Sequence, residues 1–354
     1  MTAKLRAAMS SLPAYVPGRK TPGAVILASN ESPYGLLPSV AAVLAEHAAG
    51  VSRYPDMASA QLIEAIAAHH GVAPDRIAVG AGSVEVCSQI ASAAVEGGDE
   101  VIFGWRAFEA YPIITAVVGG NAVRVPLTAD AMHDVDAMVA AVTRRTRLVF
   151  LCNPNNPTGT AVGGDDMLRL ADGIPSDVLL VVDEAYREYV DPQRVPDAFA
   201  LLGERPNVVV TRTFSKAYAL AGLRVGYCLA APEVAAAVRK CQVPFSVSGL
   251  AQQAAIAALG DVEEVNRRAK LTVAERERVR AALLDAGYAV PASEANFVWL
   301  QLGERSASFA AACLEAAIVV RPFPEEGVRV TIGTDEENDR FLAVARAFAG
   351  SLRE

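Results

Sequence analysis

Seven short apolar segments between residues 77 and 230 constrain the fold of this 354-residue chain most strongly. They read IAVG, EVIFG, AVRVPL, RLVFLC, VLLVV, NVVVT and VGYCLA, and longer helix-like segments separate them. Several are apolar at every position, which is typical of strands buried on both faces of a mostly parallel sheet. The sequence therefore predicts an α/β domain in which helices cover a mostly parallel, seven-stranded sheet.

The pattern changes after residue 249. A long charged amphipathic segment comes first, VEEVNRRAKLTVAERERVRAALLDAGY, and it is too polar for another helix that covers the sheet. The remainder predicts strands over 296–302, 319–323 and 327–333 and helices over 308–318 and from a capping-box pattern at Thr334 and Glu337 onward. We predict three parts: an N-terminal arm (1–32) that packs with the small domain, a large domain (33–249) and a small α+β domain (250–354).

Charge and composition favour a small-molecule partner. The net charge is -8 and no run of Lys or Arg occurs, which argues against nucleic acid and anionic membrane surfaces. No apolar run approaches the roughly 18 residues that span a bilayer, and the first residues lack the apolar segment of a signal peptide. The cysteines and histidines show no metal-ligand spacing. We expect a cytoplasmic protein without a metal site.

Lys216 lies in an apolar loop just after the segment NVVVT. Burial there would lower its pKa toward the neutral amine, which is the nucleophile that forms Schiff bases. The alternative is a side chain whose stem packs on the surface and whose ammonium reaches water.

Three further loops follow predicted strands. Asp183 comes after VLLVV and is expected at the carboxyl edge of the sheet, where it could bind a positive charge or cap the next helix. The loop NPNNPTG (153–159) brings amide side chains to the same edge. The loop GAGSVE (80–85) offers backbone N–H groups at a helix start, which suit an anion such as phosphate.

Together, NPNNPTG, DEAY and TFSKAYALAGLRVGY resemble the pyridoxal-phosphate-dependent aminotransferases of fold type I in order and spacing. Within that superfamily, LASNESPYG, RYPD, GAGS and VRVTIGT resemble the histidinol-phosphate aminotransferase branch, over nearly the whole chain. The segments YVPG, FGWRAFEAYP, VPFSVS and EANFVWLQLG are similar to the aromatic amino acid (phenylalanine) aminotransferases of actinobacteria.

The resemblance implies pyridoxal 5'-phosphate as the cofactor and gives the matching residues roles around its ring. Lys216 would form the Schiff base and later move the substrate proton. Asp183 would pair with the pyridinium nitrogen. Asn156 and Tyr186 would hydrogen-bond the phenolic oxygen, and Phe108 would stack on the ring.

The resemblance also implies which residues bind the cofactor phosphate and the substrate carboxylate. The cofactor phosphate would bind Ser83, Val84, Thr213, Ser215 and Arg224. Tyr54 would reach the phosphate of a neighbouring subunit, which implies a homodimer with shared active sites. Arg329 would bind the substrate α-carboxylate through its planar guanidinium.

The presence of Arg321 does not decide which substrate the protein binds. In the histidinol-phosphate branch a matching arginine helps bind the substrate phosphate, but one arginine can also bind the second carboxylate of glutamate. Tyr15, Asn30, Tyr34 and Phe323 are candidates for an aromatic side-chain pocket. The resemblance as a whole predicts an aromatic amino acid:2-oxoglutarate aminotransferase, acting on amino acids and 2-oxo acids, with histidinol-phosphate aminotransferase as the alternative.

Two further hypotheses keep the cofactor but change the activity. Related enzymes of this fold include a decarboxylase, which product analysis would distinguish. A regulatory domain that binds the cofactor without turnover is disfavoured, because the catalytic set is complete.

Overall fold

The computed structural model describes residues 3, 6, 9 and 22–350, and within them seven strands form the main sheet. They are β2 (Ile77–Gly80), β3 (Glu100–Trp105), β4 (Asn121–Pro126), β5 (Thr146–Cys152), β6 (Leu179–Asp183), β7 (Val208–Thr213) and β8 (Gly226–Leu229). Their order is β2-β8-β7-β6-β5-β3-β4. Neighbouring strands are parallel except where β8 pairs antiparallel with β2 and β7. The predicted α/β class and the mostly parallel sheet are confirmed.

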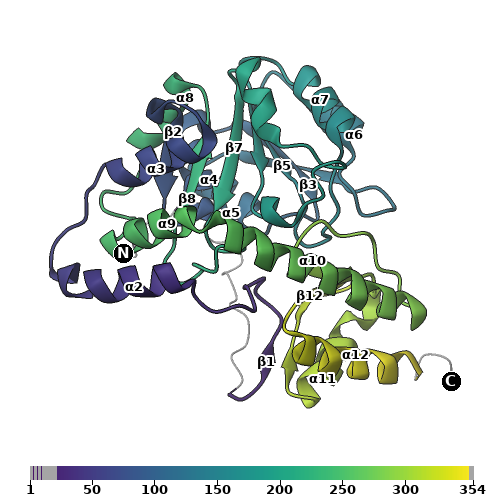
Figure 1. Ribbon diagram of the computed structural model, residues 1–354. Coiled ribbons are helices and arrows are strands. Elements are labelled where there is room, and N and C mark those ends of the chain that lie inside the picture. The colour runs from purple at the N-terminus through teal and green to yellow at the C-terminus, as the bar shows by residue number, and fades with distance from the viewer. Residues whose placement is uncertain (1–2, 4–5, 7–8, 10–21, 351–354) are drawn as a thin grey trace.

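Helices cover both faces of this sheet (Figure 1). One face packs on α4 (Ser83–Ala94), α5 (Ala110–Val118) and α8 (Pro232–Lys240). The other packs on α3 (Ala60–His70), α6 (Val135–Ala140), α7 (Gly164–Gly173) and α9 (Gly249–Gly260), and α2 (Pro38–His47) lies against α9. In β5, Leu148 and Phe150 belong to the apolar cluster on the α4, α5 and α8 side of the sheet. Val149 and Leu151 belong to the cluster on the α3, α6, α7 and α9 side. This double burial explains why the strand sequences are continuously apolar.

A second, smaller apolar core lies beyond the long helix α10 (Val262–Asp285). It surrounds the antiparallel sheet β11-β12-β9, with β9 (Phe297–Leu300), β11 (Arg321–Phe323) and β12 (Gly327–Thr331), and includes α11 (Ser306–Glu315) and α12 (Asp335–Gly350). Residues from the first half of α10 pack in the large core and residues from its second half in the small one. The division into an arm, a large and a small domain stays a prediction.

The strand expected over 319–323 is wrong as a single element. β10 (Ile318–Val319) pairs parallel with β1 (Val25–Ile26), whereas β11 pairs antiparallel with β12. The reason is that Val25 and Leu27 donate backbone N–H groups to the carbonyls of residues 317 and 319, so that one apolar run serves two sheets.

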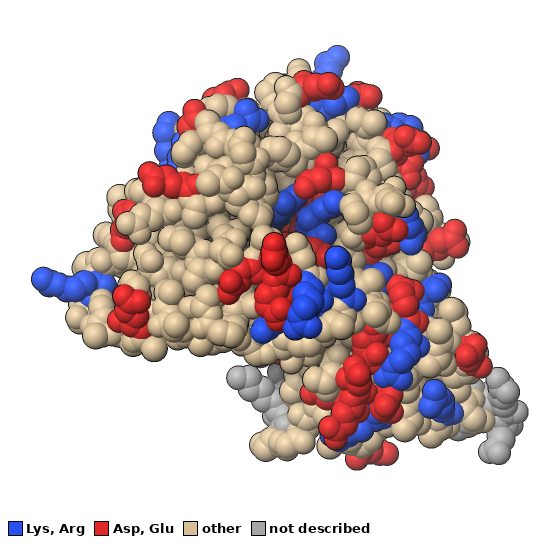
Figure 2. Space-filling model, in the orientation of Figure 1, with Lys and Arg blue, Asp and Glu red and all other residues tan. Residues whose placement is uncertain are grey.

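The helix ends and the surface follow the sequence pattern. Thr334 and Glu337 form the expected capping box: the Thr334 N–H donates to Glu337 Oε2 (2.8 Å), and the Glu337 N–H donates to Thr334 Oγ1 (3.4 Å). Figure 2 shows acidic and basic side chains side by side along the exposed face of α10, where Arg267 and Arg268 pair with Glu264. In the described part of the chain, no helix combines the length and apolarity needed to cross a membrane.

Candidate active site

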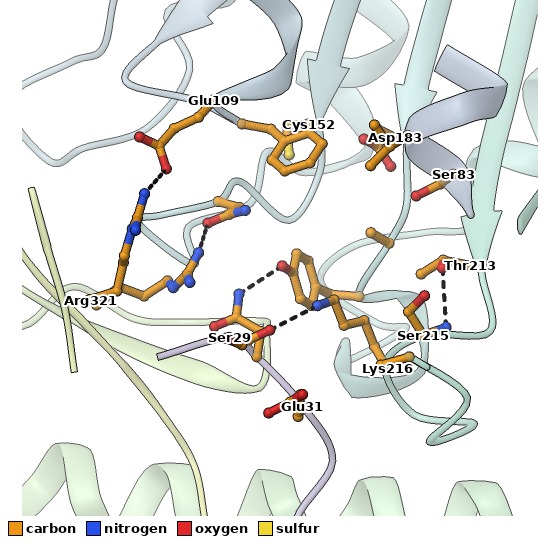
Figure 3. Close-up of a pocket in the computed structure, with 18 of the residues that line it drawn as sticks. Ser29, Glu31, Ser83, Glu109, Cys152, Asp183, Thr213, Ser215, Lys216 and Arg321 are labelled. Atoms are coloured by element: carbon orange, nitrogen blue, oxygen red, sulfur yellow. Dashed lines mark hydrogen bonds and ion pairs between the residues drawn. The ribbon is translucent and has the colours of Figure 1, made fainter. Parts of the chain in front are cut away.

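The carboxyl ends of β5, β6 and β7 border a cavity of about 300 Å³, closed on its other side by β11, β12 and residues 28–31. Figure 3 shows Asp183, Lys216, Ser83 and Arg321 around it. The residues proposed from the sequence that line this cavity are Asn30, Ser83, Val84, Phe108, Asn156, Asp183, Tyr186, Thr213, Ser215, Lys216, Arg224, Arg321, Phe323 and Arg329. Segments that are up to 300 residues apart in sequence therefore meet at one place, where open α/β sheets bind ligands.

Asp183, at the end of β6, places a buried carboxylate in the wall of the cavity. Its Oδ2 accepts a hydrogen bond from the Tyr111 hydroxyl (2.7 Å), and its Oδ1 accepts one from Thr211 (3.1 Å). Tyr111 is itself held by stacking on Phe150, with ring centroids 4.4 Å apart. Burial raises the pKa of the Asp183 carboxyl, and the two hydrogen bonds oppose that rise. A cation brought beside this carboxylate would offset its loss of water.

Lys216 follows β7 and extends into the cavity, where its Nζ donates to the carbonyl oxygen of Ser29 (3.2 Å). The pKa of Lys216 is lowered to about 7, mainly by burial and also by the positive charges of Arg329 and Arg224, whereas Glu31 opposes the shift. Near neutral pH a large fraction of the side chain is therefore the nucleophilic amine. The alternative, in which the Lys216 stem packs on the surface and its ammonium reaches water, does not match this position.

The lowered pKa of Lys216 predicts how its reactivity varies with pH. Because the neutral amine reacts, the rate at which apoprotein attaches an aromatic aldehyde such as pyridoxal phosphate should rise with pH and level off above about 7. An unperturbed lysine amide would continue to gain rate toward about 10.4. Stopped-flow absorbance from pH 5.5 to 9.5, with N-acetyl-lysine amide as the comparator, measures both curves. A protein curve that keeps rising with the comparator contradicts the assignment.

The start of α4 and the loop after β7 form a second corner of the cavity. Ser83 is the first residue of α4, whose first N–H groups have no acceptor within the helix. Arg224 lies beside it and donates to Ser215 Oγ (3.3 Å) and to the carbonyl oxygens of Ala221 (3.0 Å) and Ala81 (3.4 Å). Hydroxyls, helix N–H groups and a guanidinium thus converge as an anion site requires.

Glycine is required where β8 passes this corner. A Cβ on Gly226 would overlap the backbone nitrogen of Ser83 and the carbonyl carbon of Gly82, which are rigid backbone atoms. We expect Gly226→Ala to displace the start of α4 and to weaken the binding of a phosphate-bearing ligand at this corner about tenfold or more, with a lower melting temperature.

Gly222→Ala is the matched control for Gly226→Ala, because a Cβ on Gly222 meets no atom within 4 Å. Titration of each apoprotein with pyridoxal phosphate, followed by calorimetry, gives the affinities. Equal dissociation constants for the two variants would contradict the close approach of β8 and α4.

Arg329 lies on β12 at the opposite wall and is buried. Its Nη1 donates to Asn156 Oδ1 (2.5 Å) and its Nη2 to the carbonyl oxygen of Ala28 (2.6 Å). Its guanidinium carbon lies 5.5 Å from the centre of the Phe297 ring. These contacts fix the plane of the guanidinium, which joins the loop after β5 to the segment before Asn30.

Two further contacts complete the walls. Asn30 donates a hydrogen bond from Nδ2 to the Tyr186 hydroxyl (2.8 Å). The Tyr186 ring also packs edge-on against the Phe297 ring. Arg321 pairs through Nη2 with Glu109 Oε2 (2.9 Å), as the dashed line in Figure 3 shows.

Two of the proposed residues, Tyr54 and Tyr34, do not line this cavity. Tyr54 is 84% exposed and stacks on Phe245 in a separate surface hollow. Tyr34 lines neither the cavity nor this hollow. The centre of its ring lies 5.8 Å from the guanidinium carbon of Arg268. Tyr15 lies outside the described residues.

Sequence reasoning missed Tyr111 and Glu109. Tyr111 holds Asp183, and Glu109 lines the cavity and pairs with Arg321. Both lie in the quoted segment FGWRAFEAYP, which carried the aromatic-aminotransferase resemblance, but nothing in it identifies their partners.

The comparisons with known proteins agree with this geometry. The family model described as "Aminotransferase class I and II" matches residues 22–344. The chain therefore belongs to the class I and II aminotransferases, a pyridoxal-phosphate-dependent class of transferases, and the predicted fold type I is confirmed.

Individual relatives are more specific. The chain is 54% identical to an aromatic amino acid aminotransferase of Thermobifida fusca (strain YX), over 97% of each chain. It is also 54% identical to one from Rhodococcus jostii (strain RHA1), over 98% of this chain and 96% of the relative. Among solved structures, it is similar to a histidinol-phosphate aminotransferase from Sinorhizobium meliloti in complex with pyridoxal-5'-phosphate, with 32% identity, a TM-score of 0.90 and 99% of each chain covered.

Proposed function

We propose that this protein is an aromatic amino acid aminotransferase, which exchanges an amino group between phenylalanine or tyrosine and 2-oxoglutarate with pyridoxal 5'-phosphate bound in the cavity. The observation that carries the proposal is the near full-length similarity, at 54% identity, to relatives named for this activity. The cavity has the groups that the reaction requires.

The cavity residues fit the cofactor. The anion corner at Ser83, Ser215 and Arg224 suits a phosphate, and the buried Asp183 carboxylate suits a protonated ring nitrogen. Lys216, with its lowered pKa, suits an aldehyde. When bound, pyridoxal phosphate supplies the aldehyde that captures the substrate amine and the ring that accepts electrons from it.

The chain's own side chains would act around that group. Lys216 would hold the cofactor and, once the substrate amine takes its place, move the proton from the substrate Cα as general base. Asn156 and Tyr186 would donate hydrogen bonds to the ring oxygen, and Phe108 would cover one ring face. Asp183 would keep the ring nitrogen protonated.

Arg329 would orient the substrate. Its guanidinium carries five N–H donors in a planar fork, and its bonds to Asn156 and Ala28 hold that fork in the cavity wall. A bidentate bond to the substrate α-carboxylate would place Cα near Lys216, because both side chains line the same cavity.

We also propose a cytoplasmic homodimer. Tyr54 shares a surface hollow with the exposed side chains of Val51 and Phe245, and Met57 and Val243, which are near them in sequence, are exposed too. An apolar surface of this kind is typical of protein–protein contacts. A second copy would cover it and bring Tyr54 to the neighbour's phosphate corner. A molar mass of one subunit in light scattering of the holoenzyme would contradict the dimer.

A donor panel tests the substrate assignment. With saturating 2-oxoglutarate, kcat/KM should be at least about tenfold higher for phenylalanine and tyrosine than for histidinol phosphate, since the relatives named for aromatic substrates share most of the chain. A clear preference for histidinol phosphate would contradict the proposal and support the alternative.

A further inference from the structure

The cavity carries one more basic side chain than the cofactor and the α-carboxylate need. Among the residues that the structure describes, four basic ones line it: Lys216, Arg224, Arg321 and Arg329. In the proposed function, Lys216 and Arg224 bind the cofactor and Arg329 binds the α-carboxylate. Arg321 is left for the substrate side chain, and it already has an acidic partner within the cavity wall, Glu109.

Glu109 is directed at Arg321 and not at its own helix. It directly precedes α5, but its carboxylate makes no capping bond there. Its Oε2 lies 2.9 Å from Arg321 Nη2, and the two residues are 212 positions apart. In Figure 3 this pair lies at one end of the cavity, and Ser83, Thr213 and Ser215 lie at the other. Glu109 is therefore a counter-ion at the end where the substrate side chain must fit.

A second ion pair joins the same two segments without lining the cavity. Arg106, on the loop before α5, pairs with Glu326, in the turn between β11 and β12. Arg106 also lies over the rings of Trp105 and Phe323. Because this pair holds the loop and the hairpin together, the Glu109 carboxylate is not needed for that task.

The Glu109–Arg321 pair can exchange partners at low cost. The Arg321 side chain is 21% exposed and that of Glu109 33%, so either charge can reach water when the pair opens. A fully buried pair would leave an uncompensated charge behind.

We propose that Glu109 determines which substrate side chains the site accepts. It neutralises Arg321 while an uncharged aromatic side chain occupies the cavity, and it releases Arg321 to the second carboxylate when 2-oxoglutarate or glutamate binds. The inference rests on the proposed function, since it explains how one cavity serves both substrates of that reaction.

Glu109 should affect the binding of dicarboxylates and of aromatic substrates in opposite directions. A dicarboxylate must compete with Glu109 for Arg321, and the two carboxylates repel each other. An uncharged aromatic ring meets a neutral pair instead of an unpaired guanidinium, which would be costly to desolvate. Glu109 thus weakens dicarboxylate binding and favours aromatic side chains.

The test measures the binding of two inert ligands to the holoenzyme by titration calorimetry. Glutarate stands for the dicarboxylate and 3-phenylpropanoate for the aromatic acid. In Glu109→Gln, the ratio of the glutarate to the 3-phenylpropanoate dissociation constant should fall about three- to fivefold, the upper part of the range for an ion pair between partly exposed side chains.

Two controls isolate the pair. Glu326→Gln removes the same charge from the neighbouring ion pair and should leave the ratio within about twofold. In an Arg321→Gln background, the further change Glu109→Gln should also leave it within about twofold, because the competing guanidinium is gone.

The proposal is overturned if the ratio in Glu109→Gln stays at the wild-type value, if Glu326→Gln shifts it equally, or if the shift survives without Arg321. Wild-type turnover of phenylalanine is measured alongside. If that turnover is absent while the ratio shifts as expected, the proposed function fails and the role of Glu109 toward carboxylates holds. If turnover is present and the ratio does not shift, only the role of Glu109 fails.

Discussion

Replacement of Lys216 by alanine should lower kcat/KM by about 10⁴-fold or more, because in the proposed function it removes both the amine that would hold the cofactor and the general base. The visible absorbance of the lysine-bound cofactor should disappear with it. Lys216 is suited to both roles because its pKa is lowered to about 7 and its Nζ lies in the cavity. Steady-state kinetics and an absorbance spectrum of the purified variant measure the two effects.

Two controls accompany this variant. Lys240→Ala, at the end of α8, removes a lysine that does not line the cavity and should leave activity and spectrum unchanged. Added methylamine should partly restore turnover in Lys216→Ala but not change Lys240→Ala, since a small amine can take the place of the missing base. If Lys216→Ala keeps both its absorbance and its activity, the assignment of Lys216 is wrong.

Asp183→Asn should lower kcat by about 10² to 10⁴-fold, because it would remove one partner of the proposed buried charge pair, at a cost of about 3–5 kcal/mol. The amide keeps the size of the side chain but not its charge, and the carboxylate lies in a fully buried position held by Tyr111 and Thr211. The cofactor should also bind more weakly. Single-turnover kinetics and the dissociation constant for pyridoxal phosphate measure the two effects.

Tyr111→Phe is the matched control for Asp183→Asn. It keeps the carboxylate and the ring that stacks on Phe150, and it removes one hydrogen bond. We expect an effect of about 10- to 100-fold, the range for a hydrogen bond to a charged group, which is smaller than that of Asp183→Asn. A Tyr111→Phe defect as large as that of Asp183→Asn would show that the hydrogen bond, and not the charge, matters at this position.

The sequence predicted the large sheet and the main cavity because both rest on local patterns. Continuously apolar runs identified β5, β6 and β7 as strands with both faces covered, and the residues after such strands meet at one edge of the sheet. Asp183 and Lys216 are therefore close in space although 33 positions apart, and this required no knowledge of tertiary contacts.

Features that depend on a distant partner could not be predicted in this way. The sequence predicts one strand over residues 319–323, but residue 319 pairs with β1 as part of β10, whereas residues 321–323 pair with β12 as β11. Glu109 and Tyr111 matter only through Arg321 and Asp183, which no local pattern reveals. The proposed role of Tyr54 would likewise require a second subunit.

The central claim is tested most directly by two half-reactions with substrate amounts of holoenzyme. Phenylalanine alone should yield one phenylpyruvate for each active site, with the amino group retained by the holoenzyme. Removal of free phenylalanine and addition of 2-oxoglutarate should then yield one glutamate for each active site and restore the original spectrum. Release of carbon dioxide and phenethylamine, or no product at all, would contradict the account.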